Sequence, residues 1–211
     1  AAIICTRINS SSLPGKALLT LGGVTAIKHI LTSIKPLGIR TVLAVPPGDS
    51  AAFIEFAPAG SGVEVFIGHA ESPLHRMAEF LRQAPGVEWV VRITHDDVIV
   101  DAKTVSGLLE AMRTRPEFAF GYGYTPGIVE GAGVEVMHRD NILAAADARK
   151  DPTEFVSYFV RGHGMPRPNE FVGTPRPAIA RPYRLTMDYP GDATVLDLVL
   201  RELGADAPVD A

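Results

Sequence analysis

The sequence contains little cysteine and no long apolar run. Cys5 is the only cysteine among 211 residues, so the chain cannot build a disulfide framework, which is typical of proteins in a reducing compartment. No apolar segment approaches the roughly 18 residues that a membrane span requires, and no basic and then apolar leader precedes Ala1. We therefore expect a cytoplasmic protein without a membrane partner.

Positive charge is also scarce. The chain has 20 Lys and Arg residues against 24 Asp and Glu residues, its formal net charge is −4, and no basic run stands out. A nucleic-acid partner is therefore not expected. If an acidic protein of this kind handles an anion, a few well-placed cations must do so, because there is no overall positive field.

Several enzyme motifs are missing as well. The sequence has no Walker loop, no Rossmann glycine fingerprint and no Gly-x-Ser-x-Gly nucleophile elbow. Its histidines do not have the spacing of metal ligands, and Cys5 has no sign of a catalytic partner. These absences argue against covalent nucleophilic catalysis and against a histidine-based metal site.

What the sequence does contain is an alternation of strand-like and helix-like patterns. It is 46% hydrophobic and 21% charged, as expected of a globular protein. Strands are predicted at 1–5, 41–45, 63–67 and 89–94, and helices at about 24–34, 50–56, 73–83 and 105–112. Continuous apolar strands separated by helices indicate an α/β fold with a doubly wound, mostly parallel sheet covered on both faces.

The pattern changes after residue 118. Asp151 and Pro152 followed by Glu154 predict a helix start. The segment 162–182 is rich in Pro, Gly and Arg and predicts a long loop or lid. The elements expected here are strands at 118–124, 134–138 and 184–187 and helices at 151–161 and 192–203. We expect one domain over 1–211, with a β-rich flap, lid and dimerisation region inserted at about 118–182.

The loop after the first strand carries the first functional signal. It contains Arg7, the serines Ser10, Ser11 and Ser12, a Pro-Gly pair and Lys16. Such a loop suits a phosphate-rich ligand, because backbone N–H groups and hydroxyls can wrap the oxygens while Arg and Lys neutralise their charge. The alternative is an ordinary turn whose cations are solvated.

Aspartates at predicted strand ends carry the second signal. Asp96 and Asp97 follow the fourth strand, and Asp188 follows the last one. Ligands of open α/β sheets bind beyond the carboxyl ends of the strands, and Mg²⁺ takes one or two carboxylates together with substrate phosphates and waters. We therefore treat them as candidate metal ligands, the alternative being that they cap a helix or a turn. Asp101 and Asp192 are predicted to be helix caps.

Residues Arg7-Ile-Asn-Ser-Ser-Ser-Leu-Pro-Gly-Lys16 resemble a known signature. It is the N-terminal pattern Arg-x-x-Ser-x-Arg-Leu-Pro-Gly-Lys of cytidylyltransferases of the spore-coat polysaccharide biosynthesis type, to which CMP-ketodeoxyoctonate and CMP-acylneuraminate synthetases are similar. The resemblance extends to about residue 204. Further matches, in the same order, are Gly68 with Leu74 and Arg76, Val91-Arg92-Ile93-Thr94-x-Asp96, Gly133-Val134-Glu135-Val136, Asp151-Pro152 with Glu154, and Leu185-Thr186-Met187-Asp188-Tyr189-Pro190-x-Asp192.

The resemblance implies a Rossmann-like nucleotidyltransferase fold of the nucleotide-diphospho-sugar transferase type. It also implies Mg²⁺-dependent transfer of CMP from CTP to a sugar acid or similar small anionic acceptor, with release of pyrophosphate, in polysaccharide or glycoconjugate precursor synthesis. A homodimer is expected, as in relatives.

The resemblance also implies roles for individual residues. Asp96 and Asp188 would hold Mg²⁺, and Arg7, Lys16 and Asp96 would be catalytic. The nucleotide-binding residues would be Arg7, Ser10, Ser11, Ser12, Lys16, Arg76, Arg92 and Thr94. Candidate contacts of the acceptor are His95, Asp97, Tyr122, Glu135 and His138, although residues of the flap could instead form a dimer surface.

Four positions depart from the family pattern. Ser12 replaces a phosphate-binding arginine, His95 a glycine, Gly133 an aspartate and Phe155 a histidine. Either an arginine from 161–181 compensates, or the substrate is unusual, or activity has been lost. Two alternatives therefore stay open: a nucleotide-binding module that has lost turnover, and a metal-dependent glycosyltransferase. The two loop cations argue against the latter, since a triphosphate needs them more than a diphospho-sugar does.

Overall fold

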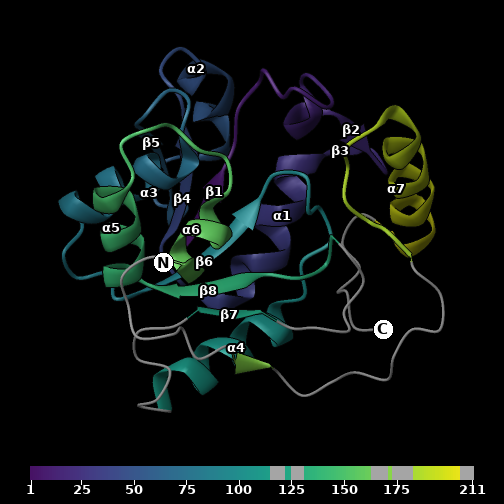
Figure 1. Cartoon of the computed structure of the whole chain (residues 1–211). Helices are drawn as coiled ribbons and strands as arrows, with labels where there is room; N and C mark the ends of the chain where they lie inside the picture. The colour runs from purple at the N-terminus through teal and green to yellow at the C-terminus, as the bar shows by residue number, and fades with distance from the viewer. Residues whose placement is uncertain (115–121, 125–130, 163–170, 173–182, 205–211) are drawn as a thin grey trace.

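The computed structural model describes residues 1–114, 122–124, 131–162, 171–172 and 183–204 (Figure 1). At its centre is a seven-stranded sheet with the order β5-β4-β1-β6-β8-β7-β9. The strands are β1 (Ala2–Cys5), β4 (Thr41–Val45), β5 (Val63–Ile67), β6 (Trp89–Thr94), β7 (Tyr122–Tyr124), β8 (Glu135–His138) and β9 (Phe171–Val172), and β2 (Thr20–Leu21) pairs with β3 (Val24–Thr25) in a second sheet. The predicted parallel core, β5-β4-β1-β6, is confirmed, and β8 runs antiparallel to β6.

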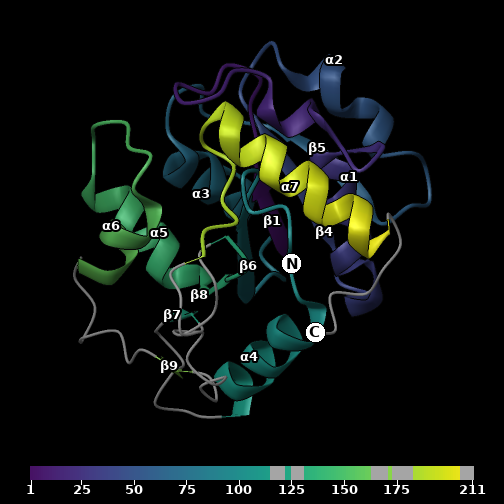
Figure 2. The same ribbon diagram turned by 90° about the vertical axis from the view of Figure 1, so that its right-hand side faces the viewer.

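Helices cover both faces of this sheet (Figure 2). One face carries α1 (Ala26–Ile34) and α4 (Ala102–Thr114), and the other carries α3 (Pro73–Gln83) and α5 (Arg139–Ala148). The other helices and 3₁₀ turns are α2 (Ser50–Phe53), α6 (Val156–Gly162), α7 (Pro190–Leu203), η1 (Lys16–Leu18), η2 (Lys35–Leu37) and η3 (Ile54–Phe56). The architecture is the doubly wound α/β fold that the alternating pattern predicts.

Helices cover both faces of the sheet, which explains why the central strands do not alternate between polar and apolar residues. In β1, Ile4 packs into the core under α1, beside Ile27. Its neighbour Ile3 packs into the opposite core, beside Leu74 of α3. Burial of each such side chain contributes about 1.5–3 kcal/mol. Because β1 and β6 are parallel and in register at Cys5 and Thr94, the loops that follow them open on the same edge of the sheet.

Side chains fix the ends of three helices. Ser72 Oγ accepts a hydrogen bond from His75 N at the start of α3, and Asp101 accepts from Lys103 N at the start of α4. Asp192 Oδ2 accepts from the N–H groups of Asp188 and Tyr189, at 2.9 and 2.8 Å, in the first turn of α7. The predictions of Asp101 and Asp192 as helix caps are confirmed, although α7 begins at Pro190 and Asp192 is its third residue.

Two predicted elements were wrong. The helix expected from Asp151 begins only at Val156, because Ser72 Oγ hydrogen-bonds to both the N–H and the carbonyl of Thr153 and thereby takes these groups out of a helical pattern. The strand expected at 184–187 does not form. The structure instead has an isolated antiparallel bridge between Asp97 and Thr186.

Other predictions about the flap fall outside the structural description. β7 is described at 122–124, whereas 118–121 of the predicted strand and most of the predicted lid at 162–182 lie outside the described residues. The single-domain boundary and the dimerisation region therefore stay predictions. Within the described ranges, no helix combines the length and the apolar character needed to cross a bilayer.

Candidate active site

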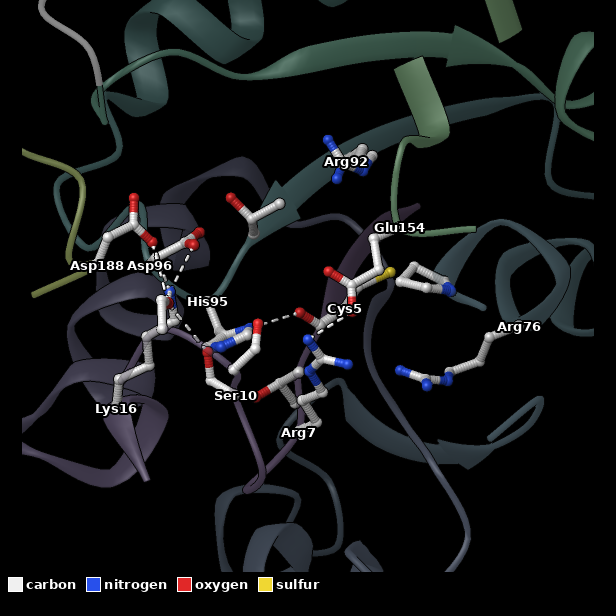
Figure 3. Close-up of a pocket in the computed structure, with 15 residues that line it drawn as sticks. Cys5, Arg7, Ser10, Lys16, Arg76, Arg92, His95, Asp96, Glu154 and Asp188 are labelled. Carbon is white, nitrogen blue, oxygen red and sulfur yellow. Dashed lines mark hydrogen bonds and ion pairs between the residues drawn. The ribbon is translucent and has the colours of Figure 1, made fainter. Parts of the chain in front are cut away.

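A pocket of about 330 Å³ opens at the carboxyl ends of β1 and β6. This is within the usual range for small-molecule sites. It brings together eleven residues from the sequence predictions: Arg7, Ser10, Ser11, Ser12, Lys16, Arg76, Arg92, Thr94, His95, Asp96 and Asp188. In Figure 3, Lys16, Asp96 and Asp188 gather at one end of the pocket, Arg76 and Glu154 lie at the other, and His95 and Ser10 lie between them.

Lys16 lies between Asp96 and Asp188 at one end of the pocket. Its buried ammonium donates to Asp96 Oδ2 at 2.8 Å, to Asp188 Oδ1 at 3.0 Å and to the carbonyl of Met187 at 3.0 Å. Burial alone would raise the pKa of Asp96, but the charge interaction with His95, followed by the hydrogen bond and the charge of Lys16, lowers it below its usual value. Two carboxylates from distant parts of the chain thus converge on one point.

Backbone contacts hold the two aspartates together. Met187 N donates to Asp96 O at 3.0 Å, and the bridge between Asp97 and Thr186 joins the same two segments. Thr94 Oγ1 donates to Asp97 Oδ2 at 2.7 Å. The carboxyl end of β6 and the segment before α7 are therefore fixed to each other next to Lys16.

Gly131 lies against this second segment and gives a testable prediction. Its φ is 93°, and an added Cβ would overlap the backbone of Leu185 and Thr186. We expect Gly131→Ala to lower the free energy of unfolding by about 3 kcal/mol or more, because it combines left-handed backbone strain with a clash against main chain. Denaturant titration measures this loss.

Gly48→Ala is the matched control for that experiment. Gly48 also has a φ of 93°, but no atom lies within 4 Å of an added Cβ. It isolates the backbone strain, which costs about 1 kcal/mol. Equal losses in the two variants would show that contact with Leu185 and Thr186 is unimportant.

Arg7 and Glu154 form an ion pair across the pocket. Arg7 Nη2 lies 2.6 Å from Glu154 Oε1, and the side chains are 26% and 55% exposed. Glu154 reaches this position because Ser72 anchors the preceding Thr153. The pair is accessible to solvent, so a stronger anion can compete with Glu154 for the guanidinium.

Arg76 forms part of the pocket wall and is 2% exposed. Its guanidinium donates to three backbone carbonyls: His69 O at 2.9 Å, Ala70 O at 3.0 Å and Ala44 O at 3.3 Å. Burial lowers the pKa of Arg76. These hydrogen bonds tie together the backbone at the ends of β4 and β5, and Arg76 also lines the pocket.

Arg92 also has a carboxylate partner. Its Nη1 donates to Glu135 Oε2 at 2.6 Å, and Ser157 Oγ of α6 donates to Glu135 Oε1 at 2.5 Å. Arg92 Nε is buried and has no partner among the described residues. The pair brings β6, β8 and α6 together beside the pocket.

The family model described as Cytidylyltransferase matches residues 1–182. The chain belongs to the cytidylyltransferase family. It is therefore an enzyme of the nucleotidyltransferase class.

Two curated relatives agree with this assignment. The chain is 24% identical over 221 residues to the spore coat polysaccharide biosynthesis protein SpsF of Bacillus subtilis (strain 168), which covers 99% of this chain and 89% of the relative. It is 33% identical over 115 residues to the 3-deoxy-manno-octulosonate cytidylyltransferase of Syntrophobacter fumaroxidans (strain DSM 10017 / MPOB), covering 53% of this chain and 45% of that protein.

Solved structures share the fold. A cytidylyltransferase from Leptospira borgpetersenii serovar Hardjo-bovis (strain JB197) has a TM-score of 0.74 at 17% identity and covers 100% of this chain and 97% of its own. A CMP:2-keto-3-deoxy-manno-octonic acid synthetase complexed with CTP has a TM-score of 0.65 at 16% identity, covering 95% and 98%. The predicted nucleotidyltransferase fold is confirmed.

The structure separates the predicted acceptor contacts of this cytidylyltransferase. Among those whose side chains the structure describes, only His95 lines the pocket. Asp97 instead ties β6 to Thr186, and burial followed by the charge of Asp96 raises its pKa to about 7. Glu135 lies behind Arg92. The side chain of Tyr122 lies outside the described part of the chain.

His138 is far from the pocket for a topological reason. Because β8 is antiparallel to β6, Glu135 pairs with Arg92 near the pocket while His138 pairs with Trp89 at the opposite end of β6. There its ring packs edge-on against Trp89, at a centroid distance of 5.0 Å, and accepts a hydrogen bond from Asp140 N at the start of α5. The structure therefore does not unite the predicted acceptor residues in one site.

Four residues of the pocket were missed as site residues. They are Cys5, Thr6, Pro73 and Glu154. Glu154 had a signal in the sequence, since it belongs to a matching family motif, but it was interpreted as part of a helix start. The other three lie at the ends of elements that meet only in the folded protein: Cys5 ends β1, Thr6 follows it and Pro73 begins α3. No residue-type pattern marks them.

Proposed function

We propose that this cytidylyltransferase transfers CMP from CTP to a small anionic acceptor such as a sugar acid and releases pyrophosphate, with Mg²⁺ as its cofactor. The observation that carries the proposal is the convergence of two loop cations and two aspartates on one pocket. We further propose that it works as a cytoplasmic homodimer in polysaccharide or glycoconjugate precursor synthesis, in line with the name of the SpsF relative.

The donor set suits Mg²⁺. Asp96 Oδ2 and Asp188 Oδ1 both lie within 3.0 Å of one ammonium nitrogen, so both can face a single small cation. Two carboxylates would leave the other positions of the coordination shell to substrate phosphates and waters. When bound, Mg²⁺ would neutralise phosphate charge and polarise the phosphoryl group.

The side chains of the pocket have distinct tasks in this reaction. Lys16 and Arg7 bind phosphate oxygens of CTP. To do so, Arg7 gives up its ion pair with Glu154 and pairs with the phosphate instead. An acceptor hydroxyl attacks the α-phosphorus, a new P–O bond forms, and the bond from the α-phosphorus to the bridging oxygen of the leaving pyrophosphate breaks. Chemistry of this kind requires mainly alignment and stabilisation of negative charge. Lys16 and Arg7 supply positive charge, and the aspartates would hold the Mg²⁺ that adds to it.

A thermal-shift screen of the four nucleoside triphosphates, each with and without Mg²⁺, tests the proposal. We expect selective stabilisation by CTP that requires Mg²⁺, because a ligand at about 100 times its dissociation constant contributes about 2.7 kcal/mol. A response to a nucleotide-sugar but not to CTP would instead favour glycosyl transfer. No response to either would mean that the loop containing Ser12 no longer binds a nucleotide and that the chain is a retired enzyme.

Ser12 provides a prediction for nucleotide affinity. It lies at the end of the pocket that holds Lys16, Asp96 and Asp188. Its Oγ is 3.3 Å from Lys16 Nζ and 3.4 Å from Asp188 Oδ1. We expect Ser12→Arg, which restores the cation of the family pattern, to lower the Kd for CTP about tenfold by adding one charge-assisted hydrogen bond. Isothermal titration calorimetry with Mg²⁺ measures it.

Ser106→Arg is the control, because Ser106 is an exposed residue of α4 that does not line the pocket. An equal gain from both variants would mean that added positive charge attracts CTP non-specifically. An unchanged Kd in Ser12→Arg alone would show that this position does not contact the triphosphate.

A further inference from the structure

Two buried polar atoms beside the aspartates have no use in the reaction described above. Thr6 Oγ1 and His95 Nε2 lack a hydrogen-bond partner among the described residues, although both residues line the pocket. Thr6 is 1% exposed and His95 is 8% exposed. Buried polar atoms are normally hydrogen-bonded, so two unpartnered ones in one pocket indicate groups that a ligand completes.

Sheet register brings these residues to the same edge of the sheet. Cys5 of β1 pairs with Thr94 of β6 in parallel, and Thr6 and His95 directly follow these two residues. His95 Nδ1 lies 3.0 Å from Cys5 O, next to Thr6 in the chain, and Thr6 and His95 line the same pocket. In Figure 3, His95 lies between Ser10 of the phosphate loop and the Lys16–Asp96 pair.

The second nitrogen of His95 fixes what Nε2 can bind. Nδ1 lies 3.0 Å from the carbonyl oxygen of Cys5. A carbonyl can only accept, so Nδ1 carries the proton, and in the neutral ring Nε2 keeps its lone pair. The ligand group at Nε2 must therefore donate a hydrogen bond. Ionised phosphate oxygens only accept, which excludes the triphosphate itself.

We propose that His95 Nε2 and Thr6 Oγ1 form a subsite for one hydroxyl group of a substrate, next to Asp96. A hydroxyl donates to Nε2 and can also pair with the Thr6 hydroxyl, which donates or accepts. The inference rests on the proposed function, under which hydroxyls come from two sources, the ribose of CTP and the acceptor. His95 stands where the family pattern has glycine, so this subsite distinguishes the chain from that pattern.

Two substitutions at His95 separate its hydrogen bonds. The amide of Asn can replace Nδ1 as donor to Cys5 O but has no group at the position of Nε2, so His95→Asn removes the acceptor and keeps the anchor. His95→Gln places an amide near the position of Nε2 and can restore an acceptor. Thr6→Val removes the second hydroxyl at nearly constant volume. Ligand-free melting curves show whether each variant folds.

Recognition of the nucleotide and recognition of the acceptor are both measured on these variants. CTP is compared with 2′-deoxy-CTP and 3′-deoxy-CTP in Mg²⁺, and 3-deoxy-manno-octulosonate is the probe acceptor. If the hydroxyl is on ribose, His95→Asn reduces the preference for CTP over one deoxy analogue by about tenfold, and His95→Gln restores part of it. If it is on the acceptor, KM for the probe rises about tenfold while Kd for CTP is unchanged.

Nitrogen-15 NMR of the His95 ring gives a readout independent of turnover. We expect Nδ1 to be protonated and Nε2 to carry the lone pair, and we expect the Nε2 resonance to move when CTP or the probe binds. Two results would overturn the subsite. One is a proton on Nε2. The other is an Nε2 resonance that neither ligand moves, combined with an unchanged preference for CTP over its deoxy analogues in His95→Asn. A wild-type protein that does not bind CTP would instead overturn the proposed function, whatever the ring tautomer.

Discussion

Asp96→Asn will lower kcat/KM for CMP transfer by about 10³-fold or more. The substitution removes one of two carboxylates suited to Mg²⁺ while it keeps the side-chain volume, and a loss of about 4 kcal/mol of transition-state stabilisation corresponds to this factor. The neutral amide can still accept the hydrogen bond from Lys16, so the fold should persist. Pyrophosphate release with saturating CTP and varied Mg²⁺ measures the effect.

Asp147→Asn is the control for Asp96→Asn. Asp147 is an exposed aspartate of α5 that pairs with Arg82 and does not line the pocket, so its variant should keep wild-type rates. If Asp96→Asn retained more than about a tenth of the wild-type rate at all Mg²⁺ concentrations, Asp96 would not be a metal ligand. The same comparison with Asp188→Asn tests the second carboxylate.

Lys16→Met will both abolish turnover and make stability depend on Mg²⁺. The ammonium separates Asp96 from Asp188 in the structure. Without it the two partly buried carboxylates repel each other, and we expect a loss of about 2–4 kcal/mol. Mg²⁺ should recover part of this loss without any nucleotide, because the ion supplies the missing positive charge between the carboxylates.

The measurement for Lys16→Met is the melting temperature as a function of Mg²⁺ concentration. Lys28→Met is its control, since Lys28 is exposed on α1 and its loss should leave both stability and its Mg²⁺ response unchanged. Matching curves for the two variants would show that Lys16 does not separate the carboxylates in solution. They would also weaken the case for a shared cation position.

The sequence predicts the parallel core and the position of the loop after the first strand well, because local patterns determine them. Continuous apolar runs bounded by turns specify strands such as 41–45 and 89–94, and the structure has both with these bounds. The position of the loop follows from the rule that parallel strands present their carboxyl ends on one edge. The residue types of the loop then indicate an anion.

Contacts between distant segments could not be predicted in the same way. Residue types marked Lys16 as a phosphate ligand, but they give no distance and so could not indicate that it separates two aspartates. The antiparallel direction of β8, which places Glu135 beside Arg92 and His138 beside Trp89 at the far end of β6, is a long-range feature that local patterns do not encode. Likewise, the anchoring of Thr153 by Ser72 overrides a strong local helix-start pattern.

Three cations of the pocket have carboxylate partners within the chain. Lys16 has Asp96 and Asp188, Arg7 has Glu154, and Arg92 has Glu135. Because the pocket brings its own counter-ions, it projects little positive potential into the solvent, and the chain as a whole is negative. Long-range steering of an anionic nucleotide should therefore be weak. Association should depend on how fast internal ion pairs exchange, and the association rate constant should respond only slightly to ionic strength.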